Sequence, residues 1–324
     1  MKKTLTFFLP QLLANPDNQY ITDSVLATLL SKAAKLEVPN TIEKNIKSYF
    51  QGFDLGEIPA GALGAFYHEI SETLSQQWCR ADPIECHVDH QSAYVVGKNH
   101  LKLKSTESQT LAGEIKTLLK QDNISLFTPT PMDWFIQIPN ETNVCMNDLT
   151  EVIGKNMGFL LPSGPDEIFW RRLGTECQML LSQNTINQQR LSKGLGLVSS
   201  LWFWGKGKLP DKLNTHFASV YSNDPTFLGC AKFANISYQQ IPTFFDPNHY
   251  NVGHSLIADN QCDLECYEQH WFKPLLASLK SGDIHQVTIN MGDGRAFVIE
   301  PKHLKYFWKG VKPLSHFNAP PLKI

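Results

Sequence analysis

The sequence lacks the features that mark several specialised classes of protein. No run of 18 apolar residues occurs among its 324 residues, which excludes an ordinary transmembrane helix. Charge of neither sign dominates, because 29 Lys and Arg stand against 31 Asp and Glu, whereas a dedicated nucleic-acid-binding protein normally shows a basic excess. With 42% hydrophobic and 11% aromatic residues, the chain can bury a sizeable core. We therefore expect a soluble, folded protein without membrane or nucleic-acid partners.

Cysteine is too sparse for a disulfide-stabilised secreted domain. The seven residues are scattered and odd in number: Cys79, Cys86, Cys145, Cys177, Cys230, Cys262 and Cys266. Reduced thiols and a cytoplasmic location fit this usage better. Lys2 and Lys3 precede an apolar stretch, as in a signal peptide, but Pro10 interrupts the stretch and no clear cleavage site follows. Leu5–Leu9 instead predicts a buried first β-strand.

The hydrophobic pattern is that of an α/β protein with an insertion. Amphipathic spacing predicts helices over residues 24–36, 41–51, 62–77, 105–121, 167–183, 225–233 and 264–279. Short apolar runs predict strands over residues 84–88, 93–96, 134–138, 197–204, 286–290 and 295–299, and a long loop is expected near 242–261. Strands alternate with helices at both ends of the chain, and the middle is distinct. This predicts a parallel sheet between helices, with an inserted smaller α+β domain.

Familiar catalytic signatures are missing. The sequence contains no G-x-S-x-G, no H-E-x-x-H and no G-x-G-x-x-G after a predicted strand. A metal site near Cys86 and His90 is disfavoured, because the local Cys and His residues lack a standard zinc spacing. A cleft enzyme that uses Cys79, Asp82 and His87 stays open as an alternative reading.

A second group of possible metal ligands lies near the C-terminus. Cys262, Cys266 and His270 fall four residues apart on a predicted helix. The first and the last would be about 12 Å apart at the rise of an α-helix, too far to share one ion. We interpret them as one face of a helix.

Cationic side chains gather around the apolar run that ends at Trp204. Gly205-Lys206-Gly207-Lys208 follows the predicted strand, so its amides and ammonium groups are candidates for holding a phosphate. Asn187-x-x-Arg190 and Trp170-Arg171-Arg172 add donors that suit phosphate or carboxylate oxygens. Trp202 and Trp204 are expected to fill the core.

A longer stretch carries a family resemblance. Residues 180–210, with Asn187-x-x-Arg190 and LWFWGKGKLP at 201–210, resemble the segment of archaeal-type cofactor-independent phosphoglycerate mutases where the chain leaves the inserted domain. Trp78–Ile84, which reads WCRADPI, lies where those proteins enter the insertion, and 265–279 is similar to their late helix. The tryptophan segment with Arg-Ala-Asp-Pro is also similar to a proteobacterial family labelled regulator of pathogenicity factors type E.

The resemblance implies an alkaline-phosphatase-like fold. Residues 1–78 and 199–324 would form the core, and 79–198 the inserted α+β domain. In active relatives, two divalent metals activate a Ser or Thr nucleophile in a cleft between the core and the insertion.

The chain departs from this pattern where the chemistry would lie. The first strand ends in Phe8-Leu9-Pro10-Gln11 rather than Asp-Gly, and the nucleophile segment Ile58–Tyr67 has no hydroxyl except that of Tyr67. The family's late histidine motif is reduced to Gly253-His254-Ser255 and lacks its two carboxylates. The Gly-Asp-His motif that follows the penultimate strand is replaced by Ile289–Asp293. We therefore expect a degenerate, non-catalytic, regulatory member of the family without metal cofactors.

Its expected partner is a phosphorylated or other anionic small molecule, or a protein. The candidate anion ligands are Arg80, Asn187, Arg190, Lys206 and Lys208.

An active mutase or phosphatase is the alternative. It would hold two divalent metals, Mn or Zn, with relocated ligands. Those would be His254, Asp259, Asp293 and His303.

Overall fold

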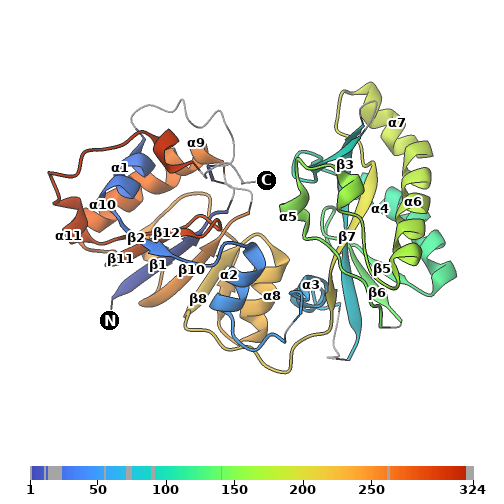
Figure 1. Ribbon diagram of the computed structural model, residues 1–324, viewed down its shortest axis with the longest axis horizontal. Coiled ribbons are helices and arrows are strands. Elements are labelled where there is room, and N and C mark those ends of the chain that lie inside the picture. Colours follow the sequence, from blue (N-terminus) through green and yellow to red (C-terminus); the bar gives the residue numbers. More distant parts are fainter. Residues whose placement is uncertain are drawn as a thin grey trace. The chain divides into compact units, whose positions relative to one another are not determined.

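The computed structural model describes residues 2–10, 12–13, 24–54, 56–70, 75–88, 92–139, 141–260 and 263–318. The chain divides into two compact units, which are described separately (Figure 1). Unit 1 comprises residues 1–53 and 212–324, and unit 2 comprises residues 54–211. Unit 2 therefore extends beyond the predicted insertion, residues 79–198, at both ends.

Unit 1 is built on a seven-stranded sheet with the order β2-β12-β11-β1-β10-β8-β9. The strands are β1 (Lys3–Phe8), β2 (Ala34–Glu37), β8 (Ser219–Ser222), β9 (Ser237–Gln239), β10 (Gly253–Ala258), β11 (Gln286–Asn290) and β12 (Arg295–Ile299). The five strands from β11 to β9 are parallel, and β12 and β2 add an antiparallel edge.

Helices cover both faces of this sheet, and β1 shows why. Successive strand side chains point to opposite faces. Phe7 contacts the rings of Trp271 and Phe272 on one face, whereas Phe8 contacts Tyr49 and Phe227 on the other. Both phenylalanines are fully buried, as a central parallel strand requires.

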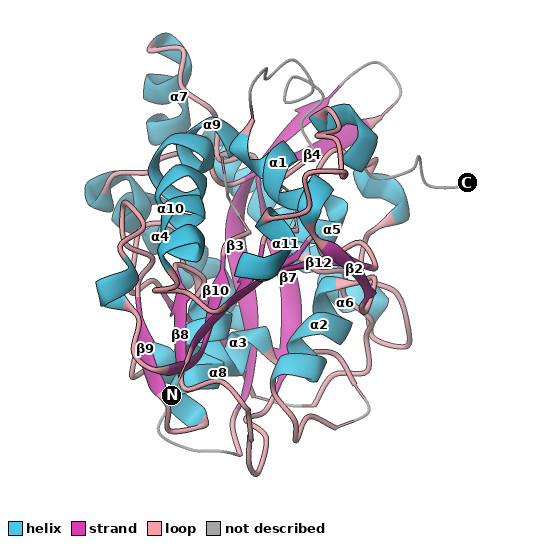
Figure 2. Cartoon of the chain, turned by 90° about the vertical axis from the view of Figure 1, so that its left-hand side faces the viewer, coloured by secondary structure: helices cyan, strands magenta, loops and turns pink. Residues whose placement is uncertain are grey.

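The helices of unit 1 are mostly short. Its α-helices are α1 (Val25–Lys32), α2 (Ile42–Tyr49), α8 (Pro225–Phe233), α9 (Leu264–Tyr267), α10 (Lys273–Ser281) and α11 (Pro301–Leu304). A π-helical turn at Glu268–Phe272 joins α9 to α10, and 3-10 turns occur at Pro247–His249 and Leu314–Phe317. Figure 2 looks onto this unit, with α1 and α10 in the foreground. The buried Glu268 carboxylate accepts bonds from the amides of Val25 and Leu26, so it caps the N-terminus of α1.

Unit 2 is an α+β unit around the 12-residue strand β3 (Gln77–Val88). The other strands are β4 (Ala93–Gly97), β5 (Ser125–Phe127), β6 (Phe135–Ile138) and β7 (Ser200–Gly207). All described pairings are antiparallel, and β3 pairs in turn with β6, β7 and β4 along its length. Its helical segments are α3 (Ala60–Tyr67), α4 (Ser105–Leu119), the 3-10 turn Lys120–Asp122, α5 (Leu149–Val152), the 3-10 turn Met157–Phe159, α6 (Glu167–Gln183) and α7 (Thr185–Ser192). In Figure 1, α3 lies on one side of β3 and β7, and α4 and α6 lie on the other.

This architecture confirms the predicted fold class, a parallel sheet between helices with a separate α+β unit. Three local predictions were wrong. The predicted helix 24–36 ends at Lys32 and continues as β2, and the predicted helix 62–77 ends at Tyr67. The predicted loop 242–261 contains β10, which pairs with β1 in the middle of the sheet. No described helix has the length and apolar character to cross a membrane.

Candidate functional site

Arg80, the first predicted anion ligand, is buried inside unit 2. Its guanidinium donates hydrogen bonds to Asp82, at 2.8 and 3.1 Å, and to Asp133, at 3.0 Å. It also lies 5.2 Å from the ring centre of Trp204, whose indole N–H donates to Asp82. Lys98 adds a second cation, 3.0 Å from Asp82. Two cations and two carboxylates thus neutralise one another within the unit.

The electrostatics of this cluster favour the ionised carboxylates. Burial by itself would raise the pKa of Asp133, but the charges of Lys98 and Arg80 outweigh it and hold the pKa at about 2. The pKa of Asp82 is likewise lowered, because Arg80 and Lys98 outweigh its complete burial. Arg80 therefore acts as the internal counter-ion of this cluster.

Asn187 and Arg190, both in α7, also serve the interior of unit 2. The Asn187 amide donates to the carbonyls of Leu181 and Val198. Arg190 donates to the carbonyl of Gly196, at 2.7 Å, and to the carboxylate of Glu107, at 2.9 Å. Both side chains are buried, so they tie α7 to its surroundings.

Lys206 and Lys208 lie at the end of β7. Lys208 pairs with the exposed Glu141. The glycine between them has a packing role, because a Cβ at Gly207 would come within 2.8 Å of the Pro59 side chain. The GKGK segment thus allows β7 to approach the start of α3 closely. The structure does not bring these lysines and the two buried arginines together in one hydrogen-bond network among the described residues.

The four alternative metal ligands do not form one centre. His254 is the second residue of β10 and Asp259 follows its last residue, so about five strand residues, or about 16 Å, separate them. Two-metal centres hold their ions about 4 Å apart, so this spacing does not favour a shared centre. His254 contacts Thr6, at 2.8 Å, and Asp259 accepts a bond from Tyr267.

The other two side chains are engaged elsewhere. Asp293 pairs with Arg295, and His303 is buried beside the carbonyl of Val298. Among the residues that the structure describes, no three His, Cys, Asp or Glu are grouped in a way that suits a metal ion.

The proposed cysteine cleft also fails to assemble. Cys79 is fully buried, and this burial raises the pKa of its thiol. His87 lies eight residues along the same strand, about 26 Å away if the strand is straight. Of the other Cys and His candidates, His90 and Cys262 lie outside the described residues.

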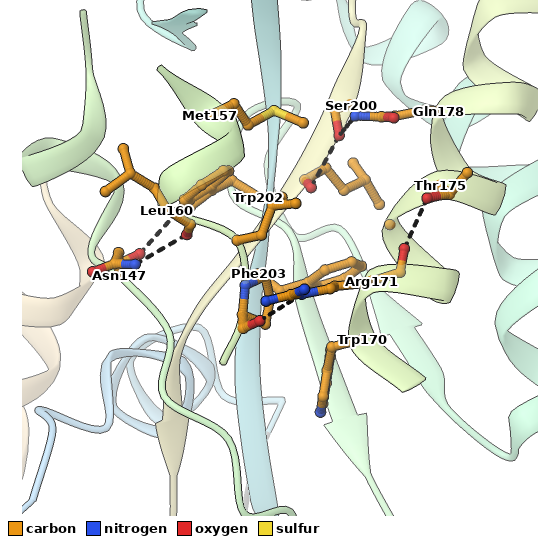
Figure 3. A pocket seen from close by; sticks show the side chains of 14 residues that line it. Asn147, Met157, Leu160, Trp170, Arg171, Thr175, Gln178, Ser200, Trp202 and Phe203 are labelled. Carbon is orange, nitrogen blue, oxygen red and sulfur yellow. Dashed lines mark hydrogen bonds between the residues drawn. The ribbon is translucent and has the colours of Figure 1, made fainter. Parts of the chain in front are cut away.

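A pocket of about 140 Å³ lies elsewhere in unit 2, between α6 and β7 (Figure 3). Among the described strands, β7 pairs only with β3, so its other edge is open. On this side of β7, Asn147 and residues from the segment 157–162 line the pocket in place of a further strand. The lining residues are Asn147, Met157, Leu160, Leu161, Pro162, Trp170, Arg171, Gly174, Thr175, Gln178, Ser200, Leu201, Trp202 and Phe203.

The walls of the pocket are aromatic and rigidly held. Phe203 packs edge-on against Trp170, with ring centres 5.4 Å apart. The indole N–H of Trp202 donates to the carbonyl of Asn147, at 2.8 Å. Gln178 donates to the hydroxyl of Ser200 across the upper part of the pocket, at 3.2 Å (Figure 3). Such a wall suits a flat or apolar ligand body.

Arg171 supplies the positive charge of this pocket. It belongs to the exposed face of α6, and 45% of its side chain is accessible to solvent. Its Nε donates to the carbonyl of Pro162, at 2.9 Å, which holds the guanidinium over the pocket. One of its NH2 groups also donates to the partly exposed carboxylate of Glu167, one turn earlier in α6, at 3.4 Å. A guanidinium has five N–H groups, and only two of those of Arg171 are used in these bonds to the described residues, so donors are left for an anion.

Two residues of this pocket were singled out in the sequence, but the pocket itself was not predicted. Arg171 belongs to the cationic group predicted from Trp170-Arg171-Arg172, and Trp202 was expected only to fill the core. Trp202 is buried, as expected, and it also forms a wall of the pocket.

Comparisons with known proteins are distant. No family model and no curated protein matches the chain. One similar solved structure is the cofactor-independent phosphoglycerate mutase from Thermoplasma acidophilum, with 13% identity, 92% of this chain and 89% of that chain covered, and a TM-score of 0.42. Another is the PH0037 protein from Pyrococcus horikoshii, with 10% identity, 92% and 87% coverage, and a TM-score of 0.48. Both are distant similarities, and neither assigns an activity to this chain.

Proposed function

We propose that this protein is a non-catalytic, phosphoglycerate-mutase-like regulatory protein that binds a small anionic molecule in the pocket between α6 and β7. The observation that carries the proposal is the placement of Arg171 beside an aromatic wall of Trp202 and Phe203. A phosphate or carboxylate would pair with the guanidinium, and the rest of the ligand would lie against the rings.

The absence of catalysis in this proposal rests on the residues at the expected nucleophile. Helix α3 has the sequence AGALGAFY, so its only hydroxyl is that of Tyr67. Removal of a nucleophile from such a mechanism costs up to about 10⁶ in rate. The scaffold would then serve binding, as often happens when one fold carries several functions.

Ligand binding is tested by tryptophan fluorescence and calorimetry. The probes are 3-phosphoglycerate, phosphoenolpyruvate and indole-3-acetate, which combine an anionic group with bodies of different size. We expect at least one to bind and to perturb the emission of Trp202. Arg171→Gln should weaken binding by roughly 10- to 100-fold, the effect of losing a charge-assisted hydrogen bond.

Arg172→Gln is the matched control. Arg172 is equally exposed, at 44%, but it pairs with Asp122 and Glu176 and does not line the pocket. Its replacement should leave binding unchanged. Equal losses in both variants, or no binding of any probe, would contradict the proposed site.

The non-catalytic part is tested separately. The protein is incubated with Mn²⁺ and Zn²⁺, passed through gel filtration and analysed for bound metal, and its mutase and phosphatase activities are then measured. About two retained ions with turnover would show that the alternative, an active metalloenzyme, is correct.

A further inference from the structure

Strand β2 is an edge of the sheet in unit 1 among the described strands. It is the first strand in the sheet order and pairs only with β12 among the described strands. All four of its residues, Ala34–Glu37, are exposed, and Leu36 is 50% accessible. Proteins usually cover or distort such an edge, because its free amides and carbonyls pair readily with another strand.

The free backbone groups of β2 can be assigned from the pairing with β12. The amide of Val38, just after β2, donates to the carbonyl of Gly294 on the β12 side. Backbone groups of successive residues point in opposite directions in an antiparallel sheet. Leu36 therefore faces β12 as Val38 does, and Lys35 and Glu37 present their amides and carbonyls outward.

We propose that two copies of this chain associate through antiparallel pairing of β2 with β2, around a two-fold axis at Leu36. In this register, Lys35 lies opposite Glu37 of the second copy, and Glu37 lies opposite Lys35. Each of these two pairs exchanges two backbone hydrogen bonds, because both residues face outward. The interface is isologous, as expected of a symmetric dimer.

Charge complementarity supports a second copy as the occupant. Lys35 and Glu37 lie on the same face of the strand, two residues apart. A residue directly opposite in an antiparallel pair lies within contact of its partner, so each Lys meets a Glu across the axis. No ion pair of Lys35 or Glu37 is found within the described part of the chain. Arg295, which lies opposite Glu37 on β12, pairs with Asp293 instead, so both charges are left for the second copy.

Exposed aromatic residues lie close to the start of this edge. Phe307 and Trp308 are 89% and 65% accessible. Their turn is anchored to the residues before β2, because Lys32 donates to the carbonyl of Tyr306, at 2.6 Å, and Lys309 donates to that of Ala33. The edge therefore continues into apolar surface, which a dimer would shield in part.

Association of the full chain is measured by light scattering and sedimentation equilibrium between about 10 and 300 µM, a range that suits a small interface. We expect a concentration-dependent rise toward twice the 36.6 kDa of one chain. Glu37→Lys places Lys opposite Lys twice, and Lys35→Glu places Glu opposite Glu twice. Each single variant should weaken the dimer roughly 30-fold.

Two rescues are specific to this register. The double variant Lys35→Glu with Glu37→Lys restores opposite charges in its own dimer. A mixture of the two single variants restores them in a heterodimer. A monomeric wild-type protein at every concentration would overturn the proposal, and so would single variants that dimerise normally. A dimer lost on Trp308→Ala but unaffected by Glu37→Lys would show that the aromatic turn, rather than the edge, forms the interface.

Discussion

The two units bury polar side chains in different ways. In unit 1, the buried polar groups of the sheet are mostly neutral. Ser219 and Ser255 share a hydrogen bond of 2.8 Å across two neighbouring strands, and Asn290 donates to Asn45. The sheet of unit 2 instead buries the charged pair Arg80 and Asp82.

This difference shows how a buried arginine can serve the fold even though it lies in a segment that resembles a family motif. Removing two charges from water is costly, and their mutual attraction compensates only when hydrogen bonds and geometry are good. Arg80 meets this requirement through Asp82 and Asp133, so its donors serve the fold. The exposed Arg171 incurs a smaller desolvation cost and keeps donors for a ligand. Burial, rather than the presence of an arginine, distinguishes the structural Arg80 from Arg171, which we propose binds a ligand.

The largest predicted effect is the loss of one charge from the cluster in unit 2. Asp82→Asn leaves Arg80 and Lys98 with only Asp133 as a carboxylate partner. Breaking a buried ion pair on one side typically costs about 3–5 kcal/mol, because the remaining charge stays desolvated. Urea unfolding followed by tryptophan fluorescence would measure the change, since Trp78, Trp134, Trp170, Trp202 and Trp204 all lie in unit 2.

The exposed pair of Asp122 with Arg172 provides the control for this prediction. Its two nearest atoms are 3.0 Å apart, a distance like those in the buried cluster, but both side chains are partly exposed. Asp122→Asn should therefore cost less than about 1 kcal/mol. Similar costs for Asp82→Asn and Asp122→Asn would mean that the buried cluster contributes no more than a surface pair.

Mild acid should lower the free energy of unfolding of unit 1 but not that of unit 2. We expect this loss to be smaller than the one caused by Asp82→Asn. Burial, with a further contribution from His216, lowers the pKa of His254 in unit 1 from 6.5 to about 4. The unfolded chain therefore binds more protons than the folded unit between these values, and the stability of unit 1 falls as the pH drops from 6.5 to 4. The pKa of Asp133 in unit 2, at about 2, is below its ordinary 3.8, so that contribution persists until the pH falls below about 4.

Unit 1 should thus weaken near pH 5 while unit 2 is unaffected. Limited proteolysis in urea at pH 7 and pH 5, with the fragments identified by mass, would show which unit opens first. His254→Gln keeps a polar partner for Thr6 and removes the titration, so it should flatten the pH dependence of unit 1. A loss of stability in unit 2 above pH 4.5, with unit 1 unchanged, would reverse the comparison.

Much of the fold was predictable because its strongest elements are locally encoded. Helices α6 and α8 and strands β11 and β12 have the bounds that periodicity predicted. Strand β10 was missed because its sequence, GHSLIA, begins with polar residues and follows a Pro- and Asn-rich stretch. Its position depends on pairing with β1 and β8, which local pattern does not encode.

The candidate site was less predictable, because some of the hydrogen-bond partners of its arginines lie far away in the sequence. Arg80 bonds to its near neighbour Asp82, but its second carboxylate, Asp133, lies 53 residues away in the sequence. The carboxylate that engages Arg190, that of Glu107, lies 83 residues away. The sequence next to Arg190 contains no acidic residue that would show this engagement, and Asp82 alone does not account for all the hydrogen bonds of Arg80. The pocket likewise combines α6 and β7 with the segment around Asn147, and only the fold brings these together.

The smallest predicted effect concerns Gly174, where the helix layer of unit 2 opens to the pocket. A Cβ at this position meets no atom within 4 Å, so a side chain fits without strain, and Gly174→Ala should stabilise α6 by about 0.5–1 kcal/mol. Gly174→Leu should also fold, but its side chain would occupy the pocket and abolish binding of the anionic probe.

Gly113, on the exposed face of α4, is the matched position for this test, since a Cβ there also meets no atom within 4 Å. Gly113→Leu should be tolerated in the same way and leave binding intact. Thermal unfolding and probe titration of Gly174→Leu and Gly113→Leu separate an effect on the stability of unit 2 from an effect on ligand binding. If Gly174→Leu binds the probe like the wild type, the ligand lies outside the pocket. The contrast between the buried Arg80 and the exposed Arg171 would then be unrelated to binding.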